Sequence, residues 1–123
     1  MLGGSNVHRL AGRSILVIED EPLIALEVAH CLTEAGAHVI KVHTGVEAAP
    51  LAEKADVAAA IVDHTLADGD SQAICERLIA RGIPFVIYSG YTKFDGACAS
   101  GVRLSKPATG AQIVDTVAGL LAG

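Results

Sequence analysis

Aromatic residues are scarce in this sequence, which has no tryptophan, two tyrosines and two phenylalanines among its 123 residues. Hydrophobic residues nevertheless make up 51% of the chain, so its core must be built mainly from Ala, Val, Ile and Leu. Small aliphatic side chains suit strands and helices that pack closely in layers. A chain of this length is expected to form one domain with a substantial core.

Long apolar segments and an excess of basic charge are also missing. No apolar run reaches the roughly 18 residues of a transmembrane helix, and residues 1–12 lack the apolar centre of a signal peptide. We therefore expect a cytoplasmic protein without a membrane partner. The formal net charge of −5 argues against direct binding of nucleic acid.

The cysteines form no recognisable motif. Cys31, Cys75 and Cys98 are odd in number and far apart, without C-x-x-C spacing, so neither a zinc site nor a redox motif is supported. Cys31 and Cys75 fall on the apolar faces of predicted helices. We expect both to be small buried hydrophobic residues.

The most apolar stretch of the chain, Ala58 to Val62, ends in a carboxylate, Asp63. A short uninterrupted apolar run is typical of a strand buried on both faces of a parallel sheet. In open sheets of this kind, ligands bind outside the carboxyl ends of the strands. Asp63 is therefore a candidate functional residue. The alternative is that it only caps the next turn, because Asp is common there.

A second predicted strand, residues 14–18, runs into Glu19, Asp20 and Glu21. Adjacent acids repel one another unless a cation lies among them, and Mg²⁺ is the ion that typically combines one or two carboxylates with phosphate. The alternative is that these acids favour the helix N-terminus behind them, which fits Glu21 better than Glu19 and Asp20. His64 is the one histidine beside this region, and a ligand role for it is a minor alternative.

Five strand–helix units follow one another along the chain. Strands are expected at about 14–18, 38–43, 57–62, 84–88 and 102–104. This alternation predicts a parallel sheet covered by helices on both faces. The second and fifth strands are too polar for the centre of the sheet. We therefore predict an α/β fold, a flavodoxin-like doubly wound (βα)5 sandwich in the order 2-1-3-4-5, whose switch point brings Glu19, Asp20 and Asp63 together.

Two of the helices are expected to be irregular. Pro50 lies inside the helix that begins near Thr44, so this helix should be short, bent or late-starting. Only the residues from Tyr91 to Gly101 separate Gly90 from the last strand. A crossover with its helix needs at least about 10–12 residues, so the fourth helix should be short or missing.

Two further strand ends carry polar groups, Ser89 after the fourth strand and Lys106-Pro107 after the fifth. This ordered set resembles the receiver domain of bacterial two-component response regulators, both single-domain receivers and those attached to hybrid sensor kinases. The resemblance covers about residues 13–121. It divides the chain into a flexible tail, 1–12, and a receiver domain, 13–123.

The resemblance implies a role for each matching residue. Asp63 would be the phosphoacceptor, taking a phosphoryl group from a sensor histidine kinase or a phosphotransfer protein. Asp20 and Asp63 would bind Mg²⁺, with Glu19 assisting through water and the backbone carbonyl of Thr65 as a further ligand.

The resemblance also assigns the groups that contact the phosphoryl oxygens. Lys106 would neutralise one of them and Ser89 would donate a hydrogen bond to another. In this family the Lys-Pro peptide bond is often cis. Such a receiver is a signalling module rather than an enzyme with a separate substrate. Its expected output is a change in the binding of a downstream protein, and a second copy of the chain is among the expected partners.

One departure keeps a second function open. Arg103 stands where the family usually has Tyr or Phe, an aromatic that turns inward during switching, and burying an arginine is costly. The signal would then run through the loop after Ser89, with Gly90 as a hinge. The alternative is an interaction module that keeps the fold without switching. Nucleotide or flavin enzymes are disfavoured, because no Gly-rich phosphate loop follows the first strand.

Overall fold

The computed structural model describes residues 9–54, 56–64, 71–90 and 96–122. Five strands form one parallel sheet in the order β2-β1-β3-β4-β5, which confirms the predicted topology. The strands are β1 (Ser14–Ile18), β2 (His38–Val42), β3 (Val57–Asp63), β4 (Phe85–Ser89) and β5 (Val102–Ser105). The helices are α1 (Pro22–Glu34), α2 (Gly45–Ala52), α3 (Ser71–Ala80), the 3₁₀ helix η1 (Gly96–Ser100) and α4 (Gly110–Ala122).

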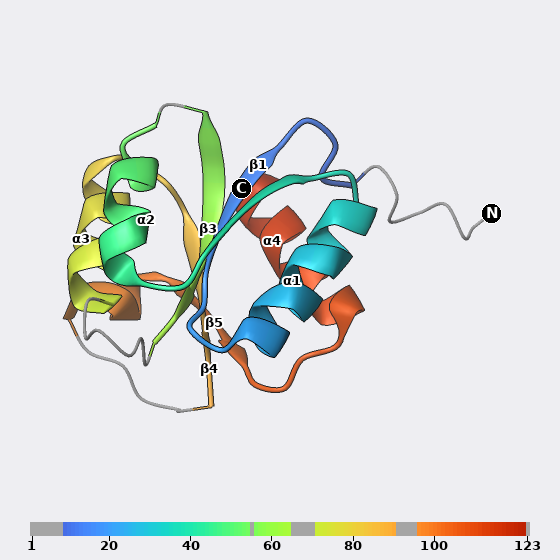
Figure 1. The fold of residues 1–123 in the computed structure, drawn as a ribbon. Coiled ribbons are helices and arrows are strands. Elements are labelled where there is room, and N and C mark those ends of the chain that lie inside the picture. The colour runs from blue at the N-terminus through green and yellow to red at the C-terminus, as the bar shows by residue number, and fades with distance from the viewer. Residues whose placement is uncertain (1–8, 55, 65–70, 91–95, 123) are drawn as a thin grey trace.

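Helices cover both faces of the sheet, with α1 and α4 on one side and α2 and α3 on the other (Figure 1). Successive side chains of a strand point to opposite faces, and the two cores follow this alternation. Ile15 and Val17 pack on the side of α1 and α4, whereas Leu16 and Ile18 pack on the side of α2 and α3. The aliphatic sequence thus fills two thin apolar layers around the sheet.

Both irregular helices occur as expected. α2 has only 8 residues and contains Pro50. In the described part of the β4–β5 connection, the one helical element is η1, a 3₁₀ helix of 5 residues. A short connection cannot hold several turns of α-helix, and 3₁₀ geometry is common in such short segments. In the described residues, the helix between β4 and β5 is therefore short, as the residue count predicted.

Residues just before β1 belong to the packed part of the molecule. Leu10 is fully buried and its N–H donates to the carbonyl oxygen of Ala35, at 2.9 Å. Arg9 forms an ion pair with Asp115 of α4. Leu10 therefore packs against the end of α1 and belongs to the core on the side of α1 and α4. Residues 1–8 of the expected tail lie outside the described residues.

One apolar residue of α3 lies at the surface against its sequence pattern. The helical spacing of Ile74, Leu78 and Ile79 predicts that all three point inward, but Ile79 is 47% exposed. It borders a hollow of about 430 Å³ formed by the ends of α3, β4, η1 and α4. Phe85, the first residue of β4, lines this hollow. The hollow thus lies at the opposite end of the strand from Ser89 and contains no carboxylate in its lining.

No helix among the described residues is long and apolar enough to cross a membrane.

Candidate phosphoryl and metal site

Three carboxylates meet at the carboxyl end of the sheet. Asp63 is the last residue of β3, and Glu19 and Asp20 directly follow β1. Because β1 and β3 are neighbours with Ile18 opposite Val62, the next residues along each strand lie side by side. One carboxylate oxygen from each of the three acids lies within 4.8 Å of the other two. The predicted acidic group therefore exists as a cluster.

This cluster is largely removed from solvent. Glu19 is 3% exposed and Asp63 is 2% exposed, while Asp20 is half-buried. Burial, the hydrogen bond with Asp63 and the negative charge of Asp63 raise the pKa of Glu19 to about 7. Burial is the largest of these causes, because it disfavours the charged form. A cation entering the cluster would reduce the repulsion between the negative charges of Glu19 and Asp63.

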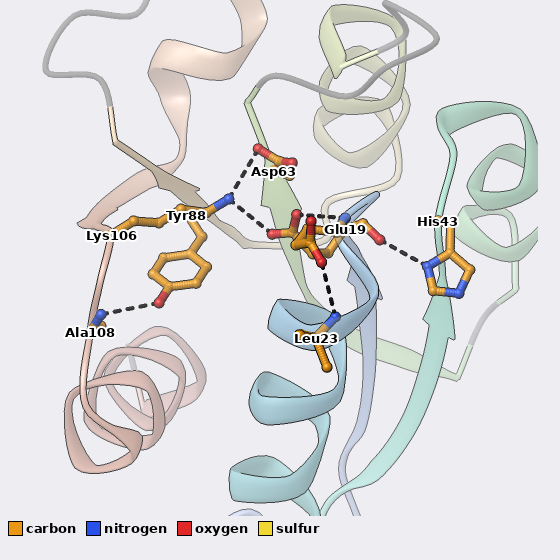
Figure 2. A network of polar contacts seen from close by, with 8 residues as sticks. Glu19, Leu23, His43, Asp63, Tyr88, Lys106 and Ala108 are labelled. Atoms are coloured by element: carbon orange, nitrogen blue, oxygen red, sulfur yellow. Dashed lines mark hydrogen bonds and ion pairs between the residues drawn. The ribbon is translucent and has the colours of Figure 1, made fainter.

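Lys106 supplies one cation to the cluster. Its Nζ lies 3.1 Å from Glu19 Oε1 and 3.5 Å from Asp63 Oδ1 (Figure 2). Burial lowers the pKa of the Lys106 ammonium, but hydrogen bonds and ion pairs with Glu19 and Asp63 outweigh this effect. Its pKa is therefore raised above the usual value. Lys106 stays charged at neutral pH and lies between two acids.

The backbone around Lys106 is held by β4. The Lys106 N–H donates to the carbonyl oxygen of Ser89 at 2.9 Å, and the Lys106–Pro107 bond is cis. The Lys106 ammonium also lies 5.4 Å from the ring centroid of Tyr88, a cation–π arrangement. The Tyr88 hydroxyl in turn accepts a hydrogen bond from the Ala108 N–H at 3.1 Å (Figure 2). Tyr88 thus contacts both the Lys106 side chain and the backbone of Ala108, two residues further along the chain.

Ser89 stands at the end of the strand next to Asp63. It is the last residue of β4 and 2% exposed. In the β3–β4 register Asp63 is opposite Tyr88, so Ser89 lies one residue further toward the carboxyl edge. Asp63, Lys106 and Ser89 therefore come from three adjacent strand ends. Thr65, the predicted carbonyl ligand, lies outside the described residues.

A histidine fastens the turn that carries the acid pair. The Glu19 N–H donates to the carbonyl oxygen of Val42 at 3.1 Å, and the Glu19 carbonyl lies 3.0 Å from His43 Nδ1. A carbonyl oxygen can only accept, so Nδ1 carries the proton in this bond. The His43 N–H donates to Glu47 Oε1 at 3.1 Å, within the Thr44–Glu47 capping box. The N-terminal cap of α2 thereby fixes the β1–α1 turn.

The sequence gives no sign of this role of His43. The residue is exposed, as expected for the polar edge strand, but its ring also reaches across to β1. No motif marks such a contact, because it joins segments 24 positions apart. The contact between Tyr88 and Lys106 likewise has no sequence signal, since it joins the ends of two different strands.

The third acid of the sequence run has a different task. The Glu21 carboxylate accepts a hydrogen bond from the Leu23 N–H at 3.3 Å and so caps α1, with Pro22 as its first residue. The Glu21 N–H donates to Glu19 Oε2 at 3.2 Å. The helix-capping interpretation is therefore correct for Glu21. Among the described residues, the side chains that could together hold a metal ion are those of Glu19, Asp20 and Asp63, and His64 is not one of them.

The donor set of this cluster fits Mg²⁺. All three side chains offer carboxylate oxygens, which hard divalent cations prefer over nitrogen or sulfur. The three carboxylates can carry three negative charges, of which the Lys106 ammonium offsets one, and the charge of Asp63 contributes to the raised pKa of Glu19 after burial and the hydrogen bond with Asp63. A divalent cation held mainly by Asp20 and Asp63 would complete the compensation.

The fold has close counterparts among solved structures. A response regulator receiver protein from Sinorhizobium medicae aligns with a TM-score of 0.81 and 24% identity, over 91% of this chain and 96% of that one. The receiver domain of a sensor histidine kinase from Pseudomonas aeruginosa, with a magnesium ion in its active site cleft, aligns with a TM-score of 0.81 and 22% identity, over 92% and 100%. The chain has the receiver fold.

A third receiver-fold structure has a phosphorylated aspartic acid and a calcium ion. It is a response regulator from Burkholderia pseudomallei, with a TM-score of 0.74 and 24% identity, over 85% of this chain and 65% of that one. The sequence matches no protein-family model and none of the curated proteins. The resemblance inferred from the strand-end residues is thus confirmed for the fold.

Proposed function

We propose that this chain is a phosphorelay receiver that accepts a phosphoryl group on Asp63 from the phosphohistidine of a sensor histidine kinase or phosphotransfer protein. One observation carries the proposal: the Asp63 carboxylate lies beside the Lys106 ammonium, 3.5 Å away, and belongs to the same cluster as the carboxylates of Glu19 and Asp20. A nucleophilic carboxylate flanked by a cation and a divalent-cation site is what phosphoryl transfer onto an acid requires.

The transfer breaks the P–N bond of the phosphohistidine and forms a P–O bond to Asp63. Its transition state spreads negative charge over three equatorial oxygens, so catalysis depends on positioned positive groups and hydrogen-bond donors. Lys106 can neutralise one oxygen after a short movement away from Glu19, and the Ser89 hydroxyl can donate to another. Held by Asp20 and Asp63, with Glu19 and the Thr65 carbonyl assisting, Mg²⁺ would neutralise the remaining charge.

The chain would catalyse only the phosphorylation and dephosphorylation of its own Asp63. The output would be a changed affinity for a downstream protein. Receiver domains in general work with histidine kinases, and one structural counterpart belongs to a sensor histidine kinase. A homodimer is a further predicted assembly.

A second candidate function rests on Arg103. Its side chain is exposed on β5, where the expected inward-turning aromatic would stand. A buried aromatic swing is therefore absent from this position. A receiver fold that binds a partner without switching would show the same surface, and it would differ by failing to bind beryllofluoride, which mimics the phosphoryl group.

The proposal is tested by phosphorylation with acetyl phosphate, followed by intact mass. We expect one phosphoryl group on the wild-type chain with Mg²⁺ and none on the Asp63→Asn variant. Asp115→Asn is the matched control, because Asp115 is an exposed aspartate of α4 with a side chain 65% accessible. Full labelling of Asp63→Asn would refute the phosphoacceptor. Undiminished labelling in excess chelator would refute the metal site.

A further inference from the structure

Two thiols meet on the α3 side of the sheet, and neither belongs to the acidic cluster. Cys75 of α3 and Cys98 of η1 are both fully buried, and their sulfur atoms lie 2.7 Å apart. A disulfide bond is about 2.05 Å long, so a shift of well under 1 Å separates the thiol pair from bonding distance. Cys31 is half-buried and belongs to the core on the other face of the sheet.

Hydrogen bonds hold η1, which carries Cys98, against α3, which carries Cys75. The Cys98 N–H donates to Gln72 Oε1 at 3.3 Å, and the Cys98 thiol donates to the carbonyl oxygen of Ser71 at 3.4 Å. Gly96 has a φ of +63°, and a Cβ there would lie 2.7 Å from Gln72 Oε1. η1 is thus fastened closely against the first turns of α3. A covalent bond between the sulfurs would keep this arrangement.

The reduced pair is protected while the fold is closed. The hydrogen bond with Cys98 and burial both raise the pKa of the Cys75 thiol, so it stays protonated. The thiolate is the reactive form, and a buried protonated thiol is inert. η1 is a single short 3₁₀ segment, and its last two residues, Ala99 and Ser100, are exposed next to Cys98. Local opening of η1 costs less than global unfolding and would expose Cys98 first.

We propose that Cys75 and Cys98 form a site of reversible oxidation, joining in an intramolecular disulfide on reaction with a small-molecule disulfide such as oxidised glutathione. The Cys98 thiolate attacks one sulfur of the oxidant, forms a mixed disulfide and releases one glutathione thiolate. Cys75 then attacks the Cys98 sulfur and releases the second glutathione. The two cysteine protons end on the two reduced glutathione molecules, so the exchange is balanced.

The disulfide would join α3 and η1, the two helices that follow the strands ending at Asp63 and Ser89. α3 follows the segment after Asp63, and η1 follows the segment after Ser89. The bond would therefore link the helix that follows Asp63 in the chain to the helix that follows Ser89. The short β4–β5 connection makes this possible, since it places Cys98 directly on α3.

The test uses the full chain incubated with oxidised glutathione, quenched with acid and analysed in denaturant. We expect the three free thiols to fall to one, that of Cys31, with a mass lower by two hydrogen atoms and a peptide joining Cys75 to Cys98. Cys31→Ser is the matched control and should crosslink like the wild type. Cys75→Ser and Cys98→Ser should each form no intramolecular crosslink. Asp63→Asn should crosslink normally, because the oxidation needs no phosphoryl chemistry.

Several results would overturn the proposal: three free thiols after treatment that oxidises an unstructured dithiol peptide, a crosslink through Cys31, a bond between two chains, or a stable glutathione adduct on Cys98. A second measurement tests the geometric fit. The crosslinked chain should melt several degrees higher than the reduced chain, and dithiothreitol should reverse this gain. A lower melting temperature would overturn the proposal, because it would show that the native fold does not accommodate the bond.

Discussion

Lys106 Nζ lies closer to Glu19, at 3.1 Å, than to Asp63, at 3.5 Å. The lysine that is proposed to bind a phosphoryl oxygen is thus held in the free protein mainly by the neighbouring acid. Adding a phosphoryl group to Asp63 would place more negative charge beside Lys106 and draw it away from Glu19. Two acids therefore compete for one cation, and phosphorylation would shift the balance toward Asp63.

Replacing Lys106 by alanine should weaken the binding of beryllofluoride to the Mg²⁺-loaded protein by about 10- to 100-fold. The reason is the loss of a charge-assisted hydrogen bond, worth about 1.5–3 kcal/mol. Isothermal titration calorimetry would measure the change. Lys41→Ala is the matched control, since Lys41 is an exposed lysine of the edge strand β2. Equal affinities for wild type and Lys106→Ala would contradict the role of Lys106.

Glu19 should make the metal-free protein more stable as the pH falls from about 8 toward 5. Its pKa is about 7 in the folded chain against 4.5 for the unperturbed group, so the folded state binds the proton more tightly. Its contribution is fully present below the unfolded value and is lost as the pH rises through about 7. We expect an effect of about 1–3 kcal/mol.

Urea denaturation at several pH values would test the Glu19 effect. Glu19→Gln should flatten this part of the profile, whereas Glu34→Gln, a change at an exposed carboxylate of α1, should leave it intact. Mg²⁺ competes with the proton for the same cluster and should also reduce the pH dependence. A wild-type stability that rises with pH relative to Glu19→Gln would refute the raised pKa.

His43 is predicted to position the acid pair. Its Nδ1–H bond to the Glu19 carbonyl fixes the turn that carries Asp20, and a hydrogen bond of this kind contributes about 0.5–1.5 kcal/mol. His43→Ala should therefore lower the Mg²⁺ affinity about 2- to 10-fold, while His43→Asn, which keeps a donor, should restore part of it. His38→Ala, at another exposed histidine of the β2 edge, is the control. An unchanged affinity in His43→Ala would remove this role.

The segment after Ser89 is predicted to carry the switching signal. A Cβ added at Gly90 would meet no heavy atom within 4 Å, and Gly90 does not adopt a left-handed φ, so Gly90→Ala should fold normally. If Gly90 is a hinge, the alanine should reduce the beryllofluoride-induced shifts of residues 89–96 in backbone NMR spectra. Arg103→Ala should leave these shifts unchanged. Large shifts confined to β5 and α4, with residues 89–96 silent, would contradict this mechanism.

The same spectra separate the two candidate functions. A phosphorelay receiver should bind beryllofluoride and shift around Ser89. An interaction module without switching should show no binding, although it would give the same fold and the same acidic cluster. The comparison requires only the free protein and the protein with Mg²⁺ and beryllofluoride.

The sequence by itself determined the architecture and most of the candidate site. Strand positions follow from short apolar runs. The polar residues at the ends of these runs are the candidate site residues Glu19, Asp20, Asp63, Ser89 and Lys106. These signals are local, because each depends on residues adjacent in the chain. The strand order followed from the polarity of two strands, which cannot lie at the buried centre of a sheet. The shortness of the helix between β4 and β5 followed from a count of the residues between these two strands.

Tertiary structure alone decided which side chains touch across distant segments. The His43 bond to Glu19, the Tyr88 ring beside Lys106, the burial of Leu10 and the pairing of Cys75 with Cys98 all join different elements. Each depends on helix length, strand register and side-chain direction taken together, to within about an ångström. Periodicity in a sequence tells which face a residue occupies, but close packing in three dimensions selects its neighbour on that face.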